Sequence, residues 1–340
     1  MHTRLIAKII LVLAIPISTF AQDPQFSQFY AAPLYLNPAF AGSAELARVG
    51  ANYRNQWPSL SATFVTYSAY FDYFFEDYNS GVGLLFMADR EGMAGLQTNS
   101  VALQYAYQFR IARNIVVRPG LEASYNTRNI DFNNLVFGDQ INLGGQYKPV
   151  TDEAFNSNWR NNYLDIGAGA LIYSRAFWVG FSAFHLLEPN QSFLDESSPL
   201  PRKYSAHLGY KILLPTKTDL SMPLGYREVS LTPTAQYKFQ GPFSQLDVGM
   251  YFTYEPLVLG TWYRGLPFKP VNDIPNNESI VLLVGVSTNG LNIGYSYDYT
   301  VSNLGIASGG AHEISIRYEF FLGDPRKPPR SVREIPCPRF

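Results

Sequence analysis

Cysteine, charged residues and long apolar runs are all scarce in this sequence. Cys337 is the single cysteine among 340 residues, so no internal disulfide can form. Beyond residue 21 no stretch of about twenty apolar residues occurs, which excludes an inner-membrane protein that spans with helices. The four histidines do not have the spacing of metal ligands, and no nucleophile elbow or phosphate-binding glycine loop is present. The sequence therefore indicates no enzyme, no metal and no cofactor.

The first 21 residues are typical of a secretory signal peptide. Arg4 and Lys8 precede the apolar run 9–17, and residues 19–21 offer a cleavage site for signal peptidase. The run is too short to span a membrane, and no cysteine follows it to make a lipoprotein anchor. We expect residues 1–21 to be removed, so that the mature chain starts at Gln22.

Aromatic residues and alternation with a period of two dominate the rest of the chain. The sequence contains 24 tyrosines and 24 phenylalanines, with only 16% charged residues, which suits the aromatic girdles of an outer-membrane barrel. From Val101 to Phe109, large apolar residues alternate with alanine or glutamine, and residues 314–320 repeat this pattern with charges on the opposite face. Such alternation predicts strands with one lipid-facing and one lumen-facing side.

About fourteen segments share this pattern, which predicts an all-β fold: a transmembrane antiparallel β-barrel over residues 46–322. The segments are 46–56, 60–75, 80–88, 96–110, 114–125, 163–173, 176–185, 203–214, 228–239, 244–254, 256–264, 279–288, 291–298 and 311–321.

The connections between these segments alternate in length. Those after even-numbered segments, such as 76–79, are mostly short, whereas those after odd-numbered segments, such as 126–162 and 265–278, are mostly long. Because outer-membrane barrels keep short turns in the periplasm, this parity predicts that both ends of the mature chain are periplasmic. The stretch 215–227 is long for a periplasmic connection, and is either a linker or a docking surface.

Residues 22–45 are aromatic, interrupted by proline and not periodic. Pro33 and Pro38 exclude a single continuous helix and a regular strand. So many aromatic side chains need cover, so we expect an N-terminal plug or strap inside the barrel. The candidate plug or partner-binding residues are Phe26, Phe29, Tyr30, Tyr35, Asn37, Pro38 and Phe40.

Charged residues recur at positions that are expected to face the lumen or to lie near the rims of the barrel. We expect opposite charges to pair across the interior and with the plug, and we favour a plugged barrel over an open pore. The charged residues are Arg48, Arg54, Arg118, Glu122, Asp165, Arg175, Asp247 and Arg317.

The strand pattern stops near residue 322, and residues 323–340 form a basic, proline-rich tail that we expect in the periplasm. The tail either binds an acidic groove of a periplasmic partner or is a plain extension. We expect Cys337 to be a free thiol exposed in this tail, with intermolecular pairing as the alternative. An acidic body with a basic tail gives no indication of nucleic-acid binding. The candidate partner-binding residues are Arg326, Arg330, Arg333, Cys337, Arg339 and Phe340.

Two stretches near the N-terminus carry a resemblance to a known family. The sequence D-P-Q-F-S-Q-F-Y (residues 23–30) directly after a signal peptide, followed by P-L-Y-L-N-P-A-F-A-G-S (residues 33–43), resembles the opening of the PorP/SprF family. These are outer-membrane proteins of the type IX secretion system of Bacteroidetes, and the terminal P-C-P-R-F (residues 336–340) also fits the family.

The resemblance implies an outer-membrane component of type IX protein secretion. Such a protein holds secreted cargo, such as the adhesins used in gliding motility, or contacts periplasmic subunits of the machine, with outer-membrane lipids around its barrel. The alternative is a small-solute channel similar to the fatty-acid transporters, which also have an N-terminal hatch.

Overall fold

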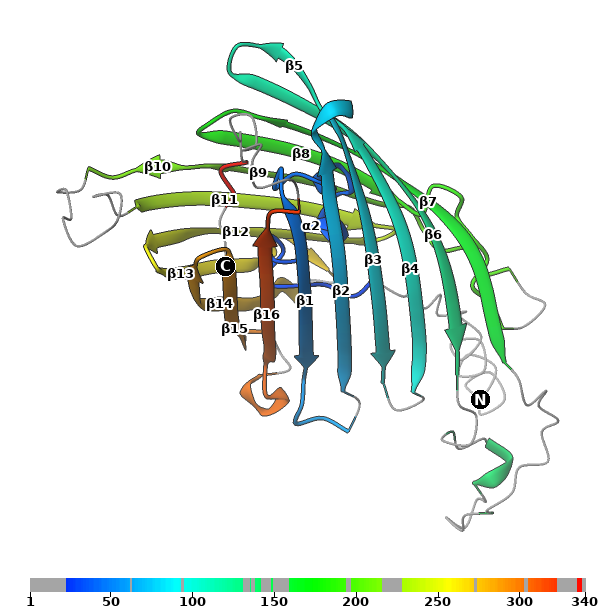
Figure 1. Cartoon of the computed structure of the whole chain (residues 1–340). Helices are drawn as coiled ribbons and strands as arrows, with labels where there is room; N and C mark the ends of the chain where they lie inside the picture. Colours follow the sequence, from blue (N-terminus) through cyan, green and yellow to red (C-terminus); the bar gives the residue numbers. More distant parts are fainter. Residues whose placement is uncertain are drawn as a thin grey trace.

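The computed structural model describes residues 23–61, 63–92, 95–130, 135, 138–141, 148, 159–193, 197–215, 228–271, 274–302, 305–322 and 335–337. Within these ranges the strands form one closed antiparallel barrel of fourteen barrel strands (Figure 1), as the alternation predicts. The labelled strands are β1 (Ala47–Gln56), β2 (Phe64–Phe75), β3 (Ser80–Glu91), β4 (Leu96–Tyr107), β5 (Phe109–Ala112), β6 (Ile115–Asn129), β7 (Arg160–Tyr173), β8 (Phe177–Phe184), β9 (Lys203–Tyr210), β10 (Ile212–Leu213), β11 (Val229–Gln240), β12 (Phe243–Tyr254), β13 (Leu257–Val271), β14 (Ile274–Thr288), β15 (Leu291–Thr300) and β16 (Ala311–Phe320).

Two of the labelled strands continue their predecessors. β5 pairs with β6 in the same register as β4, and β10 pairs with β11 in the same register as β9. The barrel closes because β1 pairs with both β16 and β2, and β11 pairs with both β9 and β12. The described short helices are α2 (Pro33–Leu36), η1 (Pro38–Phe40), η2 (Glu76–Tyr78), η4 (Gly138–Gln140) and η5 (Ile306–Ser308). In the described ranges no helix is long and apolar enough to cross a membrane.

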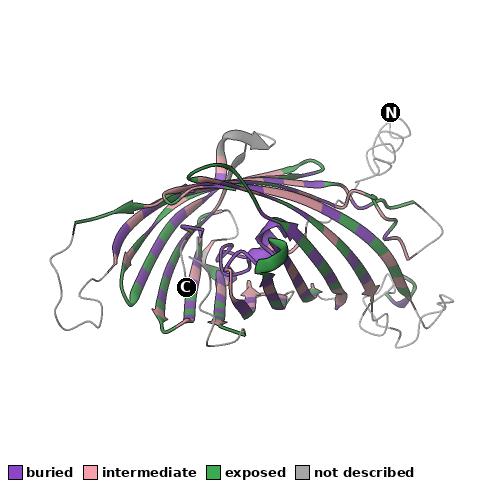
Figure 2. Cartoon of the chain, turned by 45° about the horizontal axis from the view of Figure 1, so that its top comes forward, coloured by how far each residue is buried: buried purple, intermediate pink, exposed green. Residues whose placement is uncertain are grey.

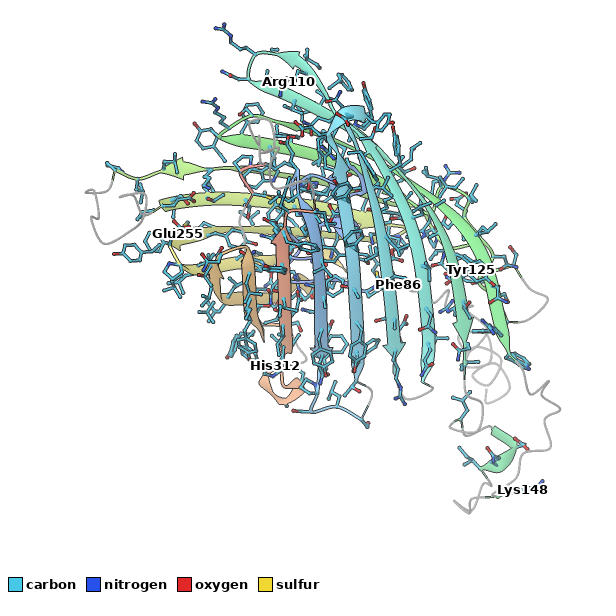
Figure 3. All side chains as sticks on the ribbon, in the orientation of Figure 1. Phe86, Arg110, Tyr125, Lys148, Glu255 and His312 are labelled. Carbon is cyan, nitrogen blue, oxygen red and sulfur yellow. The ribbon has the colours of Figure 1, made fainter. Side chains whose placement is uncertain are left out.

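Side chains alternate between the lumen and the outside along the long strands, as Figure 2 shows by the alternating burial, whereas the short strands β5 and β10 are exposed throughout. On β4, Leu103 and Tyr105 are exposed while Gln104 is fully buried. Phe86 and Tyr125 project outward from β3 and β6, at 46% and 47% exposure, so large apolar groups cover the outer face (Figure 3). This arrangement matches a lipid-facing wall around a polar interior.

The two ends of the barrel differ in their connections. We call the end with the connections 76–79, 113–114, 174–176, 255–256 and 289–290 the turn end, and the opposite end, with 130–159 and 185–202, the loop end.

One part of the loop prediction is wrong. The stretch 265–278 was expected to be an outer loop, but most of it belongs to β13 and β14, which extend as a hairpin beyond the rest of the wall. The predicted connection 215–227 lies outside the described residues, apart from Pro215.

Candidate functional site

The lumen contains the N-terminal segment, residues 23–46, which runs along the barrel interior (Figure 2). At the loop end, the backbone N–H of Asp23 donates to the side chain of Gln240, the last residue of β11. At the turn end, the segment leads directly into β1 at Ala47. We expected both ends of the mature chain at one end of the barrel, whereas Asp23 lies at the loop end because the segment crosses the lumen.

The seven candidate residues of this segment all face other parts of the protein. Six are buried, and Tyr35 is half-buried. The buried ones are Phe26, Phe29, Tyr30, Asn37, Pro38 and Phe40.

The two prolines shape the segment into short turns that fit the lumen. Pro33 starts α2 and Pro38 starts η1, the position at which a helix needs no backbone donor. Asn37 between them is extended, and its side-chain oxygen accepts from Ala39 N–H at 2.9 Å. The amide nitrogen of Asn37 donates to the backbone oxygen of Phe181 in β8 at 2.9 Å. Asn37 therefore both caps a turn and ties it to the wall.

Glycines on the inner wall bring the segment against the strands. A Cβ atom at Gly81 would lie 1.9 Å from the backbone oxygen of Ala41, and one at Gly120 would lie 2.4 Å from the backbone nitrogen of Ala39. At Gly169, a Cβ atom would lie 2.0 Å from the side-chain oxygen of Asn37. Real Cβ atoms do not approach this closely, so only glycine fits at these three wall positions.

Aromatic contacts fix the middle of the segment. The indole nitrogen of Trp178 in β8 donates to the Tyr30 hydroxyl at 2.9 Å, with the two rings edge to face. Phe40 stacks on His207 of β9, with a centroid distance of 5.5 Å. Buried aromatic pairs of this kind contribute roughly 0.5–1.5 kcal/mol each beyond the area that they bury.

A buried charge network joins four strands near the segment. Arg264 of β13 binds Asp247 of β12 at 2.7 Å and Asp298 of β15 at 2.9 Å. Arg54 of β1 also binds Asp298, at 2.9 Å. All four side chains are at most 4% exposed, so each charge depends on its partners for compensation.

The N-terminal segment takes part in this network through two backbone N–H groups and one side-chain hydroxyl. Glu313 of β16 accepts from the backbone N–H groups of Ser27 and Gln28, at 2.6 and 3.0 Å. The Ser27 hydroxyl donates to Asp298 at 2.6 Å. The segment thus gives the carboxylates of Glu313 and Asp298 hydrogen-bond donors in addition to the arginines of the strands.

A second ion pair holds the segment near the turn end. Arg48 of β1 binds Asp72 of β2 at 2.8 Å, and the two side chains are 5% and 0% exposed. Asp72 also accepts from the backbone N–H of Gly42 at 2.7 Å. Arg118 of β6 donates to the backbone oxygen of Ala39 at 3.2 Å. These contacts confirm the predicted pairing for Arg48, Arg54 and Asp247. Arg118 bonds instead to a backbone oxygen of the segment, and Arg175 is exposed in the connection between β7 and β8.

The loop-end cluster comprises Asp23, Asp165, His185, Lys203 and Gln240. The Nε2 atom of His185 lies 2.8 Å from Asp23 Oδ2, and its Nδ1 atom lies 2.5 Å from Asp165 Oδ2. The Lys203 amine also lies 2.8 Å from Asp23 Oδ2. Burial alone would raise the pKa of Asp23, but the charges of His185 and Lys203 lower it well below its ordinary value. Burial alone would lower the pKa of His185, but Asp23 and the bond to Asp165 raise it to about 9. The cluster fixes the segment's entry at the loop end.

Part of the C-terminal tail also lies inside the barrel. Ile335 is buried in the same hydrophobic cluster as Tyr30 and Trp178, and Cys337 packs against that cluster half-buried. The expectation of an exposed Cys337 thiol is therefore wrong, because the chain folds back onto the lumenal core, and burial raises the pKa of the thiol. The other tail candidates lie outside the described residues: Arg326, Arg330, Arg333, Arg339 and Phe340.

Within the described ranges, no group of three or more histidine, cysteine, aspartate or glutamate side chains is placed to hold a metal ion. The arrangement is a wall of strands around a segment of the same chain, with hydrogen bonds and ion pairs at both ends and in the middle.

The sequence of this chain matches the family model described as type IX secretion system membrane protein PorP/SprF, over residues 18–318. The chain belongs to the PorP/SprF family. The resemblance seen in residues 23–43 is confirmed, and the family and the barrel fold together make this an outer-membrane protein.

Solved structures similar to this PorP/SprF chain share little of its sequence. They include a FadL homologue from Pseudomonas aeruginosa, at 13% identity over 85% of this chain and 94% of that chain, with a TM-score of 0.43. The TodX deltaS2S3 mutant monoaromatic hydrocarbon channel has 10% identity over 85% and 94%, with a TM-score of 0.44. The KdgM porin has 6% identity over 80% and 99%, with a TM-score of 0.34. No curated protein matches the chain.

Sequence reasoning missed several residues that organise this PorP/SprF lumen. Asp72, Glu313 and Arg264 lie at inward positions of strands whose alternation is clear, so the alternation itself marks them as lumenal. The wall glycines Gly120 and Gly169 leave a weaker signal, because a glycine on a strand can also mark a bulge or a bend.

Proposed function

We propose that this protein is a non-enzymatic component of type IX secretion that holds secreted cargo, or subunits of the periplasmic machine, at the outer membrane. The observation that carries this proposal is the family match over residues 18–318. Barrel and lumenal segment would provide a rigid membrane platform, with partners bound at its ends.

We also propose that the N-terminal segment is a plug that fills the barrel lumen. Its support is the set of buried contacts described above, in which Asn37, Gly42 and Ser27 bond to strands on different sides of the barrel. The loop end would face cargo such as surface adhesins, because longer connections lie outside in outer-membrane barrels. The turn end would face periplasmic partners.

Affinity purification in mild detergent tests the partner assignment. We expect the full chain to co-purify with secreted or periplasmic proteins of the type IX system. A truncation after Gly323 should lose a periplasmic partner while the barrel stays assembled. Because the truncation also removes the contacts of Ile335, a second variant should replace Arg326, Arg330, Arg333 and Arg339 with glutamine and keep residues 335–337. Normal partner recovery by both variants would contradict a role for the tail.

The alternative function, a small-solute channel with an N-terminal hatch, makes a different prediction. Deleting residues 25–43 should then increase single-channel conductance in planar bilayers, and no protein partner should be retained. Partner recovery by the full chain, together with no solute flux through it, would exclude the channel. Solute flux without any partner would overturn our proposal.

A further inference from the structure

The barrel wall has a gap between β12 and β13 at the loop end. Their ladder runs from Tyr254–Leu257 at the turn end to Asp247–Arg264 and is not continued beyond that pair. At Arg264 the β13–β14 ladder shifts register, and Gly265 (φ +147°) pairs with Asn277 of β14. The described β12 residues 244–246 therefore pair with β11 on one side only. An unpaired strand edge is unfavourable in lipid, so this gap needs a polar occupant or water.

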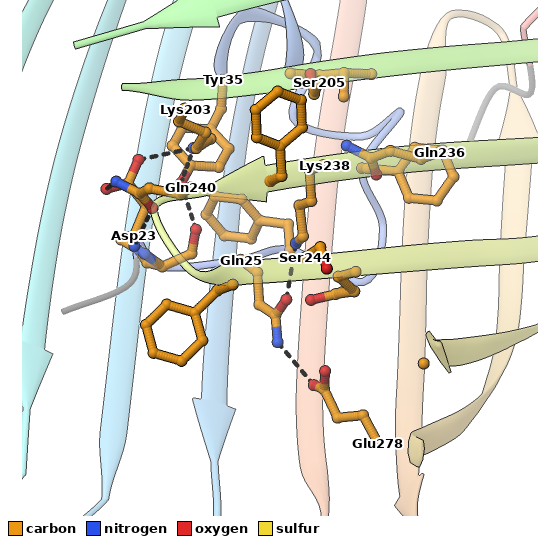
Figure 4. Close-up of a pocket in the computed structure, with 18 of the residues that line it drawn as sticks. Asp23, Gln25, Tyr35, Lys203, Ser205, Gln236, Lys238, Gln240, Ser244 and Glu278 are labelled. Atoms are coloured by element: carbon orange, nitrogen blue, oxygen red, sulfur yellow. Dashed lines mark hydrogen bonds and ion pairs between the residues drawn. The ribbon is translucent and has the colours of Figure 1, made fainter. Parts of the chain in front are cut away.

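A cavity of about 340 Å³ lies behind this gap (Figure 4). Both sides of the gap line it: Ser244 and Gln245 come from β12, and Gly265 comes from β13. The N-terminal segment supplies an apolar side through Phe26 and Phe29, which are 4% and 5% exposed. The volume is in the range of sites that hold small organic molecules, roughly 300–1,000 Å³.

One cation of the cavity lining has no carboxylate partner. Lys203 is neutralised by Asp23 at 2.8 Å. Lys238 of β11, by contrast, donates to the amide oxygen of Gln25 at 2.8 Å, and no described carboxylate lies within ion-pair distance of its amine. The Gln25 amide N–H donates to Glu278 at 2.8 Å, so the Gln25 amide bridges Glu278 and Lys238 (Figure 4). An amine with three donors and one neutral acceptor can take a further, anionic acceptor.

We propose that this cavity is a binding site for a small amphiphile with an anionic head, of the class of fatty carboxylates. The head accepts from the Lys238 amine, and the chain lies against Phe26 and Phe29. The gap between β12 and β13 connects the cavity to the side of the barrel, so the ligand enters laterally from the membrane. This inference does not depend on the secretion role.

Binding of dodecanoate to the full chain in nanodiscs of zwitterionic lipid tests the head-group contact. Wild type should bind dodecanoate more tightly than dodecanol, which has the same chain and no charge. Lys238→Met keeps most of the apolar stem and removes the charge, so its affinity for dodecanoate should fall about tenfold or more, with dodecanol unchanged. Lys211→Met is the matched control, because Lys211 is paired with Glu228 and does not line the cavity. It should leave both affinities unchanged, and equal melting temperatures should show that both variants fold.

The route of entry is tested with Ser244→Trp, which places a large side chain at the gap. It should slow binding of dodecanoate supplied in the bilayer and leave binding of water-soluble hexanoate unchanged. Equal slowing of both probes, or of neither, would overturn lateral entry.

Three results would overturn the site itself. The first is a dodecanoate-binding signal from empty nanodiscs that equals that of wild type. The second is equal dodecanoate affinity in wild type and Lys238→Met. The third is a bound peptide, in place of an amphiphile, in native mass spectrometry of the purified protein.

Discussion

The contact between the N-terminal segment and the glycines of the inner wall can be tested with a single methyl group. In Gly120→Ala the new Cβ atom would lie 2.4 Å from the nitrogen and 2.6 Å from the Cα atom of Ala39, and 2.7 Å from the carbonyl carbon of Pro38. All three are backbone atoms, so the clash is relieved only if the turn around η1 moves away from β6. Overpacking of this kind costs about 1–3 kcal/mol.

Gly83→Ala is the matched control, because Gly83 is also on the inner wall and faces the same segment. Its new Cβ atom would lie 2.9 Å from Leu34 Cδ1, the end of a flexible side chain, and 3.3 Å from Ala41 Cβ, so a rotation of Leu34 and a shift of a few tenths of an ångström relieve both contacts. We expect a loss well below that of Gly120→Ala.

Hydrogen exchange of the purified barrel in detergent measures the effect where it arises. The backbone N–H groups of Phe40 and Ala41 donate to Asn37 and Pro38 within the turn, so they should exchange slowly in wild type. Gly120→Ala should accelerate exchange of residues 39–41 by about fivefold to 150-fold, the range that corresponds to about 1–3 kcal/mol. Strands β13 to β15 should stay protected. Equal exchange in both variants and wild type would refute close packing of the segment on this wall.

Three further predictions concern charge and burial. Asp298→Asn weakens two buried arginine contacts and should destabilise the barrel by about 3–5 kcal/mol in denaturant titration, whereas Arg202→Gln, whose ion pair is about half exposed, should cost under about 1 kcal/mol; equal losses would contradict the network. The pKa of His185 is raised from 6.5 to about 9, so its stabilisation is complete below pH 6.5 and lost as the pH rises through about 9; the melting temperature should fall over that range, and His185→Gln should remove that change. Cys337 should react with maleimide about tenfold more slowly than a cysteine in place of exposed Arg175, introduced in a Cys337→Ser background. The reason is that the Cys337 thiol is half-buried and has a raised pKa. Equal rates would place the tail outside the barrel.

The barrel itself could be predicted from sequence because each strand carries its own evidence. In residues 101–107 alternate side chains are large and apolar, and the structure points these outward while Gln104 faces the lumen. The proline spacing and aromatic content of residues 22–45 likewise indicated a segment that needs cover. Both inferences depend only on local pattern.

Contacts between distant parts of the chain were beyond this reasoning. Arg54 was expected to pair, but its partners Asp298 and Glu313 lie more than two hundred residues away, and their positions depend on the closure of the barrel. The fold-back of Ile335 onto the core was missed because basic and proline-rich neighbours hide a single apolar residue. The length of β13 was missed because Pro267 and Pro270 within it are residues that normally end a strand.

The proposed secretion role is tested most directly by quantitative mass spectrometry of surface and secreted proteins from a deletion strain, its parent and a strain complemented with the wild-type gene. Our account predicts loss of one or a few large surface proteins if the protein is dedicated to particular cargo, or loss of the whole type IX set if it belongs to the core machine, with recovery on complementation. An unchanged set of secreted and surface proteins would contradict the account.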